Sequence, residues 1–225
     1  MIKLDKRLTA IYNIVRENTR LADIGTDHAY LVCRLLCDGK IKFGYACDIN
    51  KGPLENAKIT AQQNNVDNIK FVLCDGLAGV EKDEVDEIVI AGMGGELIEK
   101  ILTCCEWSKS KDKHFILQPM TKADSLRKYL CENGFFIENE TGITDNGHYY
   151  TVMSVYYIGE TSPYDECFLQ IGKLSPNHPE SKEYILNKID VLKKHANAVK
   201  DIQPETAKKL FEVIEKMKGV CSNEN

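Results

Sequence analysis

The sequence of 225 residues lacks any stretch of the roughly 20 consecutive apolar residues that a membrane-spanning helix requires. Residues 1–7 contain no apolar core of signal-peptide length. Nine cysteines are present but no Cys-x-x-Cys pair, so the spacing of a zinc ribbon or a thiol redox motif is missing. We therefore expect a cytoplasmic protein with reduced thiols and no bound metal.

A basic composition is also missing. Acidic residues (34) outnumber lysines and arginines (29), which gives a formal net charge of −5. This balance argues against a wholly basic nucleic-acid binder, although it is compatible with a local basic face. Hydrophobic residues make up 43% of the chain, enough for a full core. The length predicts a main domain with an appendage, and we expect a monomer. A change of pattern near Tyr164 divides the two into residues 1–162 and residues 163–225.

Two nucleotide-binding motifs are absent as well. The first predicted turn has no Gly-x-Gly-x-x-Gly pattern, and the chain has no Gly-x-x-x-x-Gly-Lys-Ser/Thr phosphate loop. Instead, residues 21–24 form a short, mostly apolar run before Gly25, and a second apolar run starts at Leu31. This pattern predicts a buried strand, a sharp turn and a helix that begins near Thr26 or Asp27. A single glycine suits a nucleoside ligand without pyrophosphate, and S-adenosylmethionine is the obvious candidate.

Further strand and helix patterns alternate along the chain. This alternation predicts an α/β fold with a Rossmann-like parallel sheet covered on both faces. Asn146-Gly147 joins the last two apolar runs and predicts a terminal antiparallel hairpin. After the first strand, the predicted strands cover residues 41–50, 69–74, 86–91, 114–117, 135–143 and 149–158. Besides the helix near Thr26, the predicted helices cover residues 5–18, 54–63, 96–102 and 122–133.

Acidic residues and glycines stand at the ends of three predicted strands. Asp48 lies 23 residues after Gly25, close to the spacing at which an acid binds ribose hydroxyls in dinucleotide-type folds. Asp75-Gly76 follows the third strand, and residues 91–95 (Ala-Gly-Met-Gly-Gly) follow the fourth. Helix capping and tight turns are the alternatives, but the spacing favours a ligand site.

The C-terminal region has a different pattern. Apolar residues recur at steps of four and three over residues 185–199 and again over residues 207–217. A proline-containing turn separates the two stripes, which predicts an antiparallel helical hairpin with coiled-coil packing. Its lysines are nearly balanced by acids, so a solvated surface is the default interpretation. The alternative is a phosphate-facing cluster that includes Lys193 and Lys194.

Together these motifs resemble the bacterial tRNA (adenine-22) N1-methyltransferases, the TrmK family of class I methyltransferases. The resemblance covers nearly the whole chain and implies a seven-stranded domain with a coiled-coil appendage. It also implies S-adenosylmethionine as methyl donor, and nitrogen 1 of an adenine in the D-loop region of tRNA as acceptor. The motifs that carry it are residues 21–31, Lys51-Gly52-Pro53, Asp75-Gly76-Leu77, residues 91–95, Gln118-Pro119-Met120 and the helical hairpin.

The resemblance assigns residues to the cofactor. It implies that Gly25 lies against the methionine part, that Asp48 binds the ribose hydroxyls, and that Asp75 binds the adenine amine. Gly92 and Met93 are then expected near the transferred methyl group. The remaining cofactor-binding candidates are Asp27, Ile49, Asn50, Gly76 and Gly94.

The candidate catalytic residues follow the first strand. Tyr30 or His28 is expected to stack on or orient a flipped adenine, and Asp27 to support the developing charge or the cofactor's amino group. The alternatives are core packing, a surface hydrogen bond and a helix cap, respectively. The candidate substrate-binding residues are Arg7, Gln118, Lys193 and Lys194.

The fourth strand is followed by Ala91-Gly92-Met93-Gly94, not by the Asp/Asn-Pro-Pro-aromatic motif of enzymes that methylate exocyclic amines. This disfavours an exocyclic amine as the acceptor. Two other functions stay open: methylation of a small molecule or protein, and a non-catalytic module that binds S-adenosylmethionine and uses the hairpin as an interaction arm.

Overall fold

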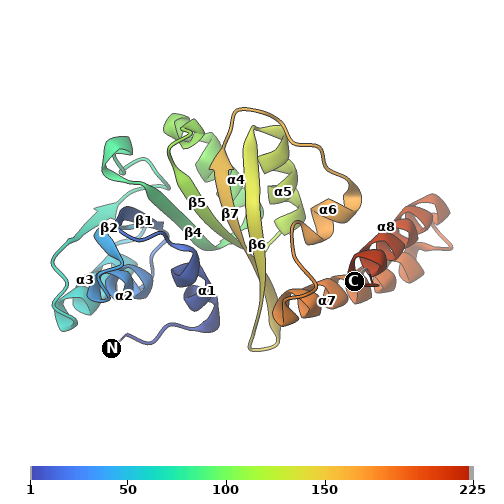
Figure 1. The fold of residues 1–225 in the computed structure, drawn as a ribbon, viewed down its shortest axis with the longest axis horizontal. Helices are drawn as coiled ribbons and strands as arrows, with labels where there is room; N and C mark the ends of the chain where they lie inside the picture. The colour runs from blue at the N-terminus through green and yellow to red at the C-terminus, as the bar shows by residue number, and fades with distance from the viewer. Residues whose placement is uncertain (1, 223–225) are drawn as a thin grey trace.

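The computed structural model describes residues 2–222 and contains one seven-stranded sheet of order β3-β2-β1-β4-β5-β7-β6 (Figure 1). The strands are β1 (Thr19–Ile24), β2 (Ile41–Asp48), β3 (Ile69–Leu73), β4 (Glu87–Gly94), β5 (His114–Thr121), β6 (Phe135–Asp145) and β7 (His148–Tyr157). The α-helices are α1 (Lys6–Ile14), α2 (Tyr30–Cys37), α3 (Lys51–Gln63), α4 (Gly95–Thr103), α5 (Ala123–Glu132), α6 (Glu166–Ile171), α7 (Pro179–Val199) and α8 (Pro204–Ser222). Two short 3₁₀ helices are η1 (Lys82–Glu84) and η2 (Glu106–Lys109).

The strand directions confirm the predicted Rossmann-like sheet. Strands β1 to β5 pair in parallel, and β7 pairs antiparallel with both β5 and β6. The strand order reverses beside β1, whose neighbours are β2 and β4. In an open α/β sheet, ligands bind outside the carboxyl ends of the strands at such a reversal.

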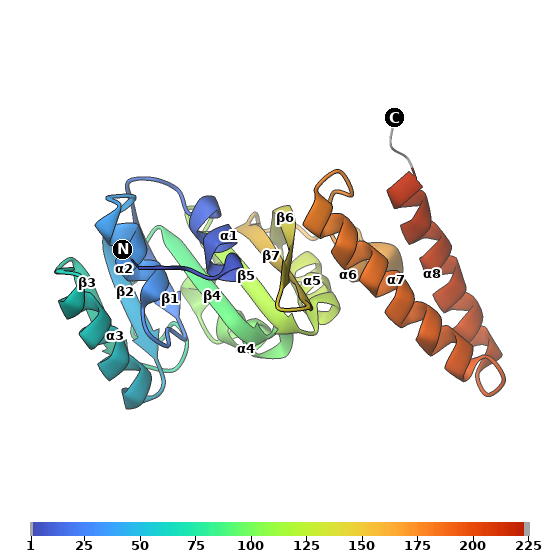
Figure 2. The same cartoon turned by 90° about the horizontal axis from the view of Figure 1, so that it is seen from below.

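Apolar side chains cover both faces of the sheet, which explains the continuous apolar runs of the sequence. Along β4, Ile88 and Ile90 belong to the core beneath α4 and α5, whereas Val89 between them belongs to the core beneath α1 and α2. Successive side chains of a strand point to opposite faces, so one run serves both cores. The result is a three-layer arrangement with α1, α2 and α3 on one face and α4 and α5 on the other (Figures 1 and 2).

Two predicted helix boundaries near the N-terminus are wrong. Helix α1 ends at Ile14 and not near residue 18, although Asp5 caps it as its first boundary suggests. Helix α2 begins at Tyr30, because Ala29 has a left-handed backbone (φ +53°) that an α-helix cannot contain; the Thr26 hydroxyl accepts the Ala29 N–H at 3.1 Å in the turn before it. Asp27 therefore lies in a loop and caps no helix. The Asn146-Gly147 turn is confirmed, with positive φ at both residues.

The C-terminal hairpin is confirmed by helices α7 and α8. Their facing side chains, including Ile185, Ile189, Ile214 and Met217, form a separate apolar core. The short helix α6, which the sequence pattern did not reveal, leads into the hairpin. Figure 2 shows the hairpin projecting from the β6 edge of the sheet. No helix in the described part of the chain is long and apolar enough to cross a membrane, and none of the nine cysteines in that part is in a disulfide.

A fully buried ion pair joins the sheet to the C-terminal region. Arg127 of α5 donates to the Glu140 carboxylate of β6 at 2.8 Å and to the backbone carbonyl of Leu169 in α6 at 2.7 Å. Glu140 also accepts from the Thr151 hydroxyl at 3.0 Å. At Gly172, any Cβ would lie 1.9 Å from the Glu140 carboxylate, so only glycine fits there. The pair therefore fixes the chain where it leaves the sheet.

Replacing Arg127 alone is expected to destabilise the protein strongly. Arg127→Met leaves the Glu140 carboxylate buried without its countercharge, which costs about 3–5 kcal/mol of unfolding free energy. Urea unfolding followed by circular dichroism measures this loss. The exposed pair of Lys58 and Glu55 supplies a control, since Lys58→Met is expected to cost less than about 1 kcal/mol. Equal losses in the two variants would contradict the assigned role of Arg127.

Candidate active site

A crevice lies at the carboxyl ends of β1, β2, β3 and β4. Its position coincides with the reversal of strand order, so residues far apart in the sequence meet there. Seven cofactor candidates predicted from the sequence line it, together with apolar side chains of α4. The lining includes Gly25, Asp48, Ile49, Asn50, Asp75, Gly76, Met93, Leu97 and Ile101.

Gly25 ends β1 in a conformation that other residues rarely adopt, with φ at +79°. A Cβ there would also lie 2.2 Å from the terminal methyl of Met93. The Gly25 N–H donates to the Cys47 carbonyl at 2.8 Å, which ties the turn to β2. Glycine is therefore required both by the backbone and by the contact with Met93 across the crevice.

Two carboxylates stand on the crevice at neighbouring strand ends. Asp48 Oδ1 accepts the Asn50 N–H at 2.7 Å, which orients the carboxyl group at the end of β2. Asp75 is exposed after β3. A second cavity, of about 350 Å³, shares Asp75, Gly76, Leu97 and Ile101 with the crevice. Carboxylates that accept hydrogen bonds from hydroxyls and amines, beside apolar side chains, fit a nucleoside.

Gln118 links the glycine-rich end of β4 to α1. It is fully buried, and its Oε1 accepts the Gly92 N–H at 2.9 Å and the Arg7 guanidinium at 3.1 Å. The sequence named Arg7 and Gln118 as substrate-binding candidates, and the structure brings both next to Gly92. Gln118 therefore sets the position of this loop and of the Arg7 side chain together.

The three candidate catalytic residues lie side by side. The His28 and Tyr30 rings are stacked with centroids 5.0 Å apart, and His28 Nε2 lies 3.4 Å from Asp27 Oδ2. Ala29 between them has φ at +53°, a strained conformation for a residue with a Cβ. Tyr30 is 41% exposed, so one aromatic surface is open to a ligand. This loop follows the Gly25 turn directly but does not itself line the crevice.

Asp23 was missed as a site residue. It lies within β1, is 9% exposed, and hydrogen-bonds the Thr26 side chain. Burial raises the pKa of Asp23 to about 6, although Thr26 and the charge of Arg7 act in the opposite direction. The sequence does contain a signal for Asp23, since it is an acid inside the apolar run of residues 21–24. Burying an unpaired carboxylate costs folding free energy, so such a residue is a candidate for a functional role.

Three candidates lie away from this assembly. Lys193 and Lys194 are exposed on the half of α7 that projects away from the sheet (Figure 2). Gly94 is the N-cap of α4 and does not line the crevice. Their roles therefore stay predictions.

The sheet order, the antiparallel last strand and the acids at the ends of β2 and β3 together define a class I methyltransferase fold. A family model described as a methyltransferase domain matches residues 4–153. Among curated proteins, the tRNA (adenine(22)-N(1))-methyltransferase of Bacillus subtilis is 32% identical over 174 residues, which cover 77% of this chain and 73% of that protein.

Solved structures extend the similarity over the whole chain. The Streptococcus pneumoniae protein Sp1610 in complex with S-adenosyl-L-methionine is 30% identical, with a TM-score of 0.79 over 98% of this chain and 100% of that one. M. capricolum TrmK in complex with S-adenosyl-homocysteine is 26% identical, with a TM-score of 0.80 over 96% of this chain and 99% of that one. The chain belongs to the tRNA (adenine(22)-N(1))-methyltransferase family, TrmK.

The raised pKa of Asp23 predicts a pH-dependent stability difference. Folded Asp23 holds its proton more tightly than unfolded Asp23, so its contribution is complete below about pH 4 and is lost as pH rises through about 6. Asp23→Asn has no carboxylate to ionise, so it is expected to gain about 2–3 kcal/mol relative to wild type between about pH 4 and pH 7. Urea unfolding of both proteins across this range measures the gain. A difference that does not change with pH would contradict the prediction.

Proposed function

We propose that the protein transfers a methyl group from S-adenosylmethionine to nitrogen 1 of adenine 22 in tRNA. The chain is a member of the TrmK family, and the Asp27–Tyr30 loop lies beside its acid-lined crevice. This arrangement supports the proposal most. We further propose that residues 1–162 bind the cofactor and that residues 163–225 contact tRNA. The chain would act as a monomer in the cytoplasm.

In this proposal the crevice positions the cofactor. Asp48 accepts hydrogen bonds from the ribose hydroxyls, and Asp75 accepts from the adenine amine beside Gly76. Gly25 lies against the methionine part, and Gly92 and Met93 lie near the transferred methyl group. S-adenosylmethionine supplies a methyl group on a positively charged sulfur, which a nucleophile displaces directly.

The acceptor requires placement more than proton transfer. Nitrogen 1 of neutral adenine already has a lone pair, so no general base has to remove a proton. The enzyme must instead align this lone pair with the methyl carbon and the sulfur. The exposed ring of Tyr30, supported from behind by His28, offers a stacking surface for an adenine turned out of the RNA. Asp27 is the carboxylate placed to support the positive charge that develops on the base.

The first experiment maps the methylated nucleotide. Purified protein is incubated with labelled S-adenosylmethionine and unmodified tRNA, and the product nucleoside and its position are determined. We expect 1-methyladenosine at position 22. Label at another nucleotide would overturn the acceptor while leaving the cofactor assignment intact. Cofactor binding without any label would favour another substrate or a non-catalytic role.

Variants of Tyr30 and Asp48 separate the two halves of the site. Tyr30→Ala is expected to lower kcat/KM for tRNA about 10-fold or more, because stacking on one base contributes about 1–3 kcal/mol. Its cofactor Kd should not change, and Tyr30→Phe should retain activity.

Asp48→Asn is expected to raise the cofactor Kd about 10-fold or more, since charge-assisted hydrogen bonds are lost. Calorimetry for the cofactor and initial rates for tRNA distinguish these effects. An unchanged rate for Tyr30→Ala would reject its role.

A further inference from the structure

A third cavity lies between the methyltransferase sheet and the helical hairpin. The end of β5, the start of α5, the first residues of β7 and the first half of α7 enclose about 100 Å³. Met120 forms its border with the active site, because its Sδ accepts the Gln118 amide at 3.6 Å. Gln118 in turn holds Gly92 and Arg7. The cavity therefore begins where the candidate active site ends.

The charge of this cavity is one-sided. Lys122 at the start of α5 and Lys188 of α7 both line it, and its lining contains no aspartate or glutamate. Among the residues that the structure describes, neither lysine forms an ion pair or a side-chain hydrogen bond, unlike Lys6, which pairs with Glu180 in the first turn of α7. In a chain of net charge −5, two uncompensated cations beside the active site favour an anionic ligand.

The backbone at Lys122 is held in a costly conformation. Its φ is +55°, and the other non-glycine residues with positive φ are three asparagines and Ala29. A lysine in this region costs about 1–2 kcal/mol. The Lys122 carbonyl packs against Gly95, where a Cβ would lie 2.3 Å away. The position of Lys122 is therefore fixed relative to the end of β4, which leads from the active site into α4.

Aromatic side chains accompany the two lysines. Tyr149 and Tyr150 at the start of β7 line the cavity, and Tyr149 is 37% exposed. Tyr149 makes no ring contact with another aromatic residue in the described part of the chain, whereas Tyr150 lies near His148. A cationic groove with exposed aromatic rings is the combination that binds single-stranded nucleic acid, since phosphates contact the cations and bases stack on the rings.

We propose that the RNA backbone next to the target adenine binds here, with a phosphate between Lys122 and Lys188 and a neighbouring base on Tyr149. This assignment rests on the proposed function, because it requires an RNA whose target base occupies the adjoining site. A cavity of this size accommodates a phosphate group and leaves the stacked base outside, on the exposed tyrosine.

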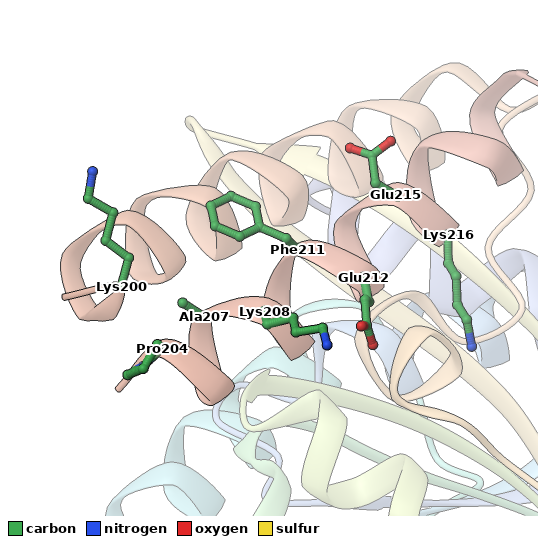
Figure 3. Close-up of a pocket in the computed structure, with 8 residues that line it drawn as sticks. All are labelled: Lys200, Pro204, Ala207, Lys208, Phe211, Glu212, Glu215 and Lys216. Carbon is green, nitrogen blue, oxygen red and sulfur yellow. The ribbon is translucent and has the colours of Figure 1, made fainter. Parts of the chain in front are cut away.

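A larger groove on α8 lacks the one-sided positive charge of this cavity. Figure 3 shows lysine and glutamate side chains around Phe211. Lys208 and Lys216 share that groove with Glu212 and Glu215, and Lys216 is paired with Asp165 at 2.9 Å. Charges of both signs give no preference for phosphate. The cavity at Lys122 and Lys188 is therefore the better phosphate site.

The test removes the two charges and measures the salt dependence of tRNA binding. Lys122→Gln/Lys188→Gln is compared with wild type and with Lys42→Gln/Lys111→Gln, a control with two exposed lysines near the amino ends of β2 and β5. Each phosphate contact releases counterions, so the slope of log K against log salt should decrease by one to two units in the first variant only. Its KM for tRNA should rise about 10-fold, while its Kd for S-adenosylmethionine, which also reports correct folding, should stay unchanged. Lys188→Gln alone, at a half-buried position of α7, gives an independent and milder variant.

Tyr149 provides a second readout. Tyr149→Ala should weaken tRNA binding about 5-fold or more without changing the salt slope, and Tyr149→Phe should restore binding. A wild-type slope in the Lys122 and Lys188 variant, or an equal loss in the control, would overturn the phosphate site. Methylation at another nucleotide with the expected slope change would reject the proposed acceptor but retain this site. Failure of the wild-type protein to bind tRNA would reject both.

Discussion

The arrangement of the active site depends on one constraint: five parallel strands end at the same edge of one sheet. Each strand is held in register by its neighbours, so the residue that follows it has a fixed place at that edge. Gly25, Asp48 and Asp75 are separated by more than 20 residues from one another in the chain, yet they line one crevice. The helices matter to the site mainly because they cover both faces of the sheet and so make the parallel arrangement stable.

This constraint explains why much of the molecule follows from its sequence. Apolar runs that end in an acid identify both a strand and the end of it that faces the crevice, so the positions of Asp48 and Asp75 could be predicted before any coordinates. The glycines after Ala91, predicted to form a turn, instead extend β4 to Gly94. The Asn146-Gly147 turn was equally informative because few dipeptides accept positive φ at both positions. The fold class and the cofactor side of the site therefore follow from local patterns and the resemblance they carry.

Features that depend on contacts between distant segments could not be predicted from the sequence. The start of α2 at Tyr30 depends on the left-handed backbone of Ala29, a conformation that alanine rarely adopts and that the sequence pattern does not signal. The role of Asp23 depends on how deeply β1 is buried and on the approach of Arg7 from α1. Helix α6 is too short for a periodic signal, and its position is set by Arg127 from α5. Likewise, Lys122 and Lys188 are 66 residues apart in the sequence and meet only because α7 packs beside β7.

The buried pair of Arg127 and Glu140 has a consequence for how a large substrate would be recognised. Together with the hydrogen bond from Gly142 N–H to the Ser181 hydroxyl at 3.0 Å, it attaches the base of the hairpin to the sheet at two points. The conformational entropy of the hairpin is lost when the chain folds, so no further entropy is lost in ordering it when a partner binds. Such an arm works as a fixed template, so a partner is selected by whether its own three-dimensional shape matches the angle between arm and sheet.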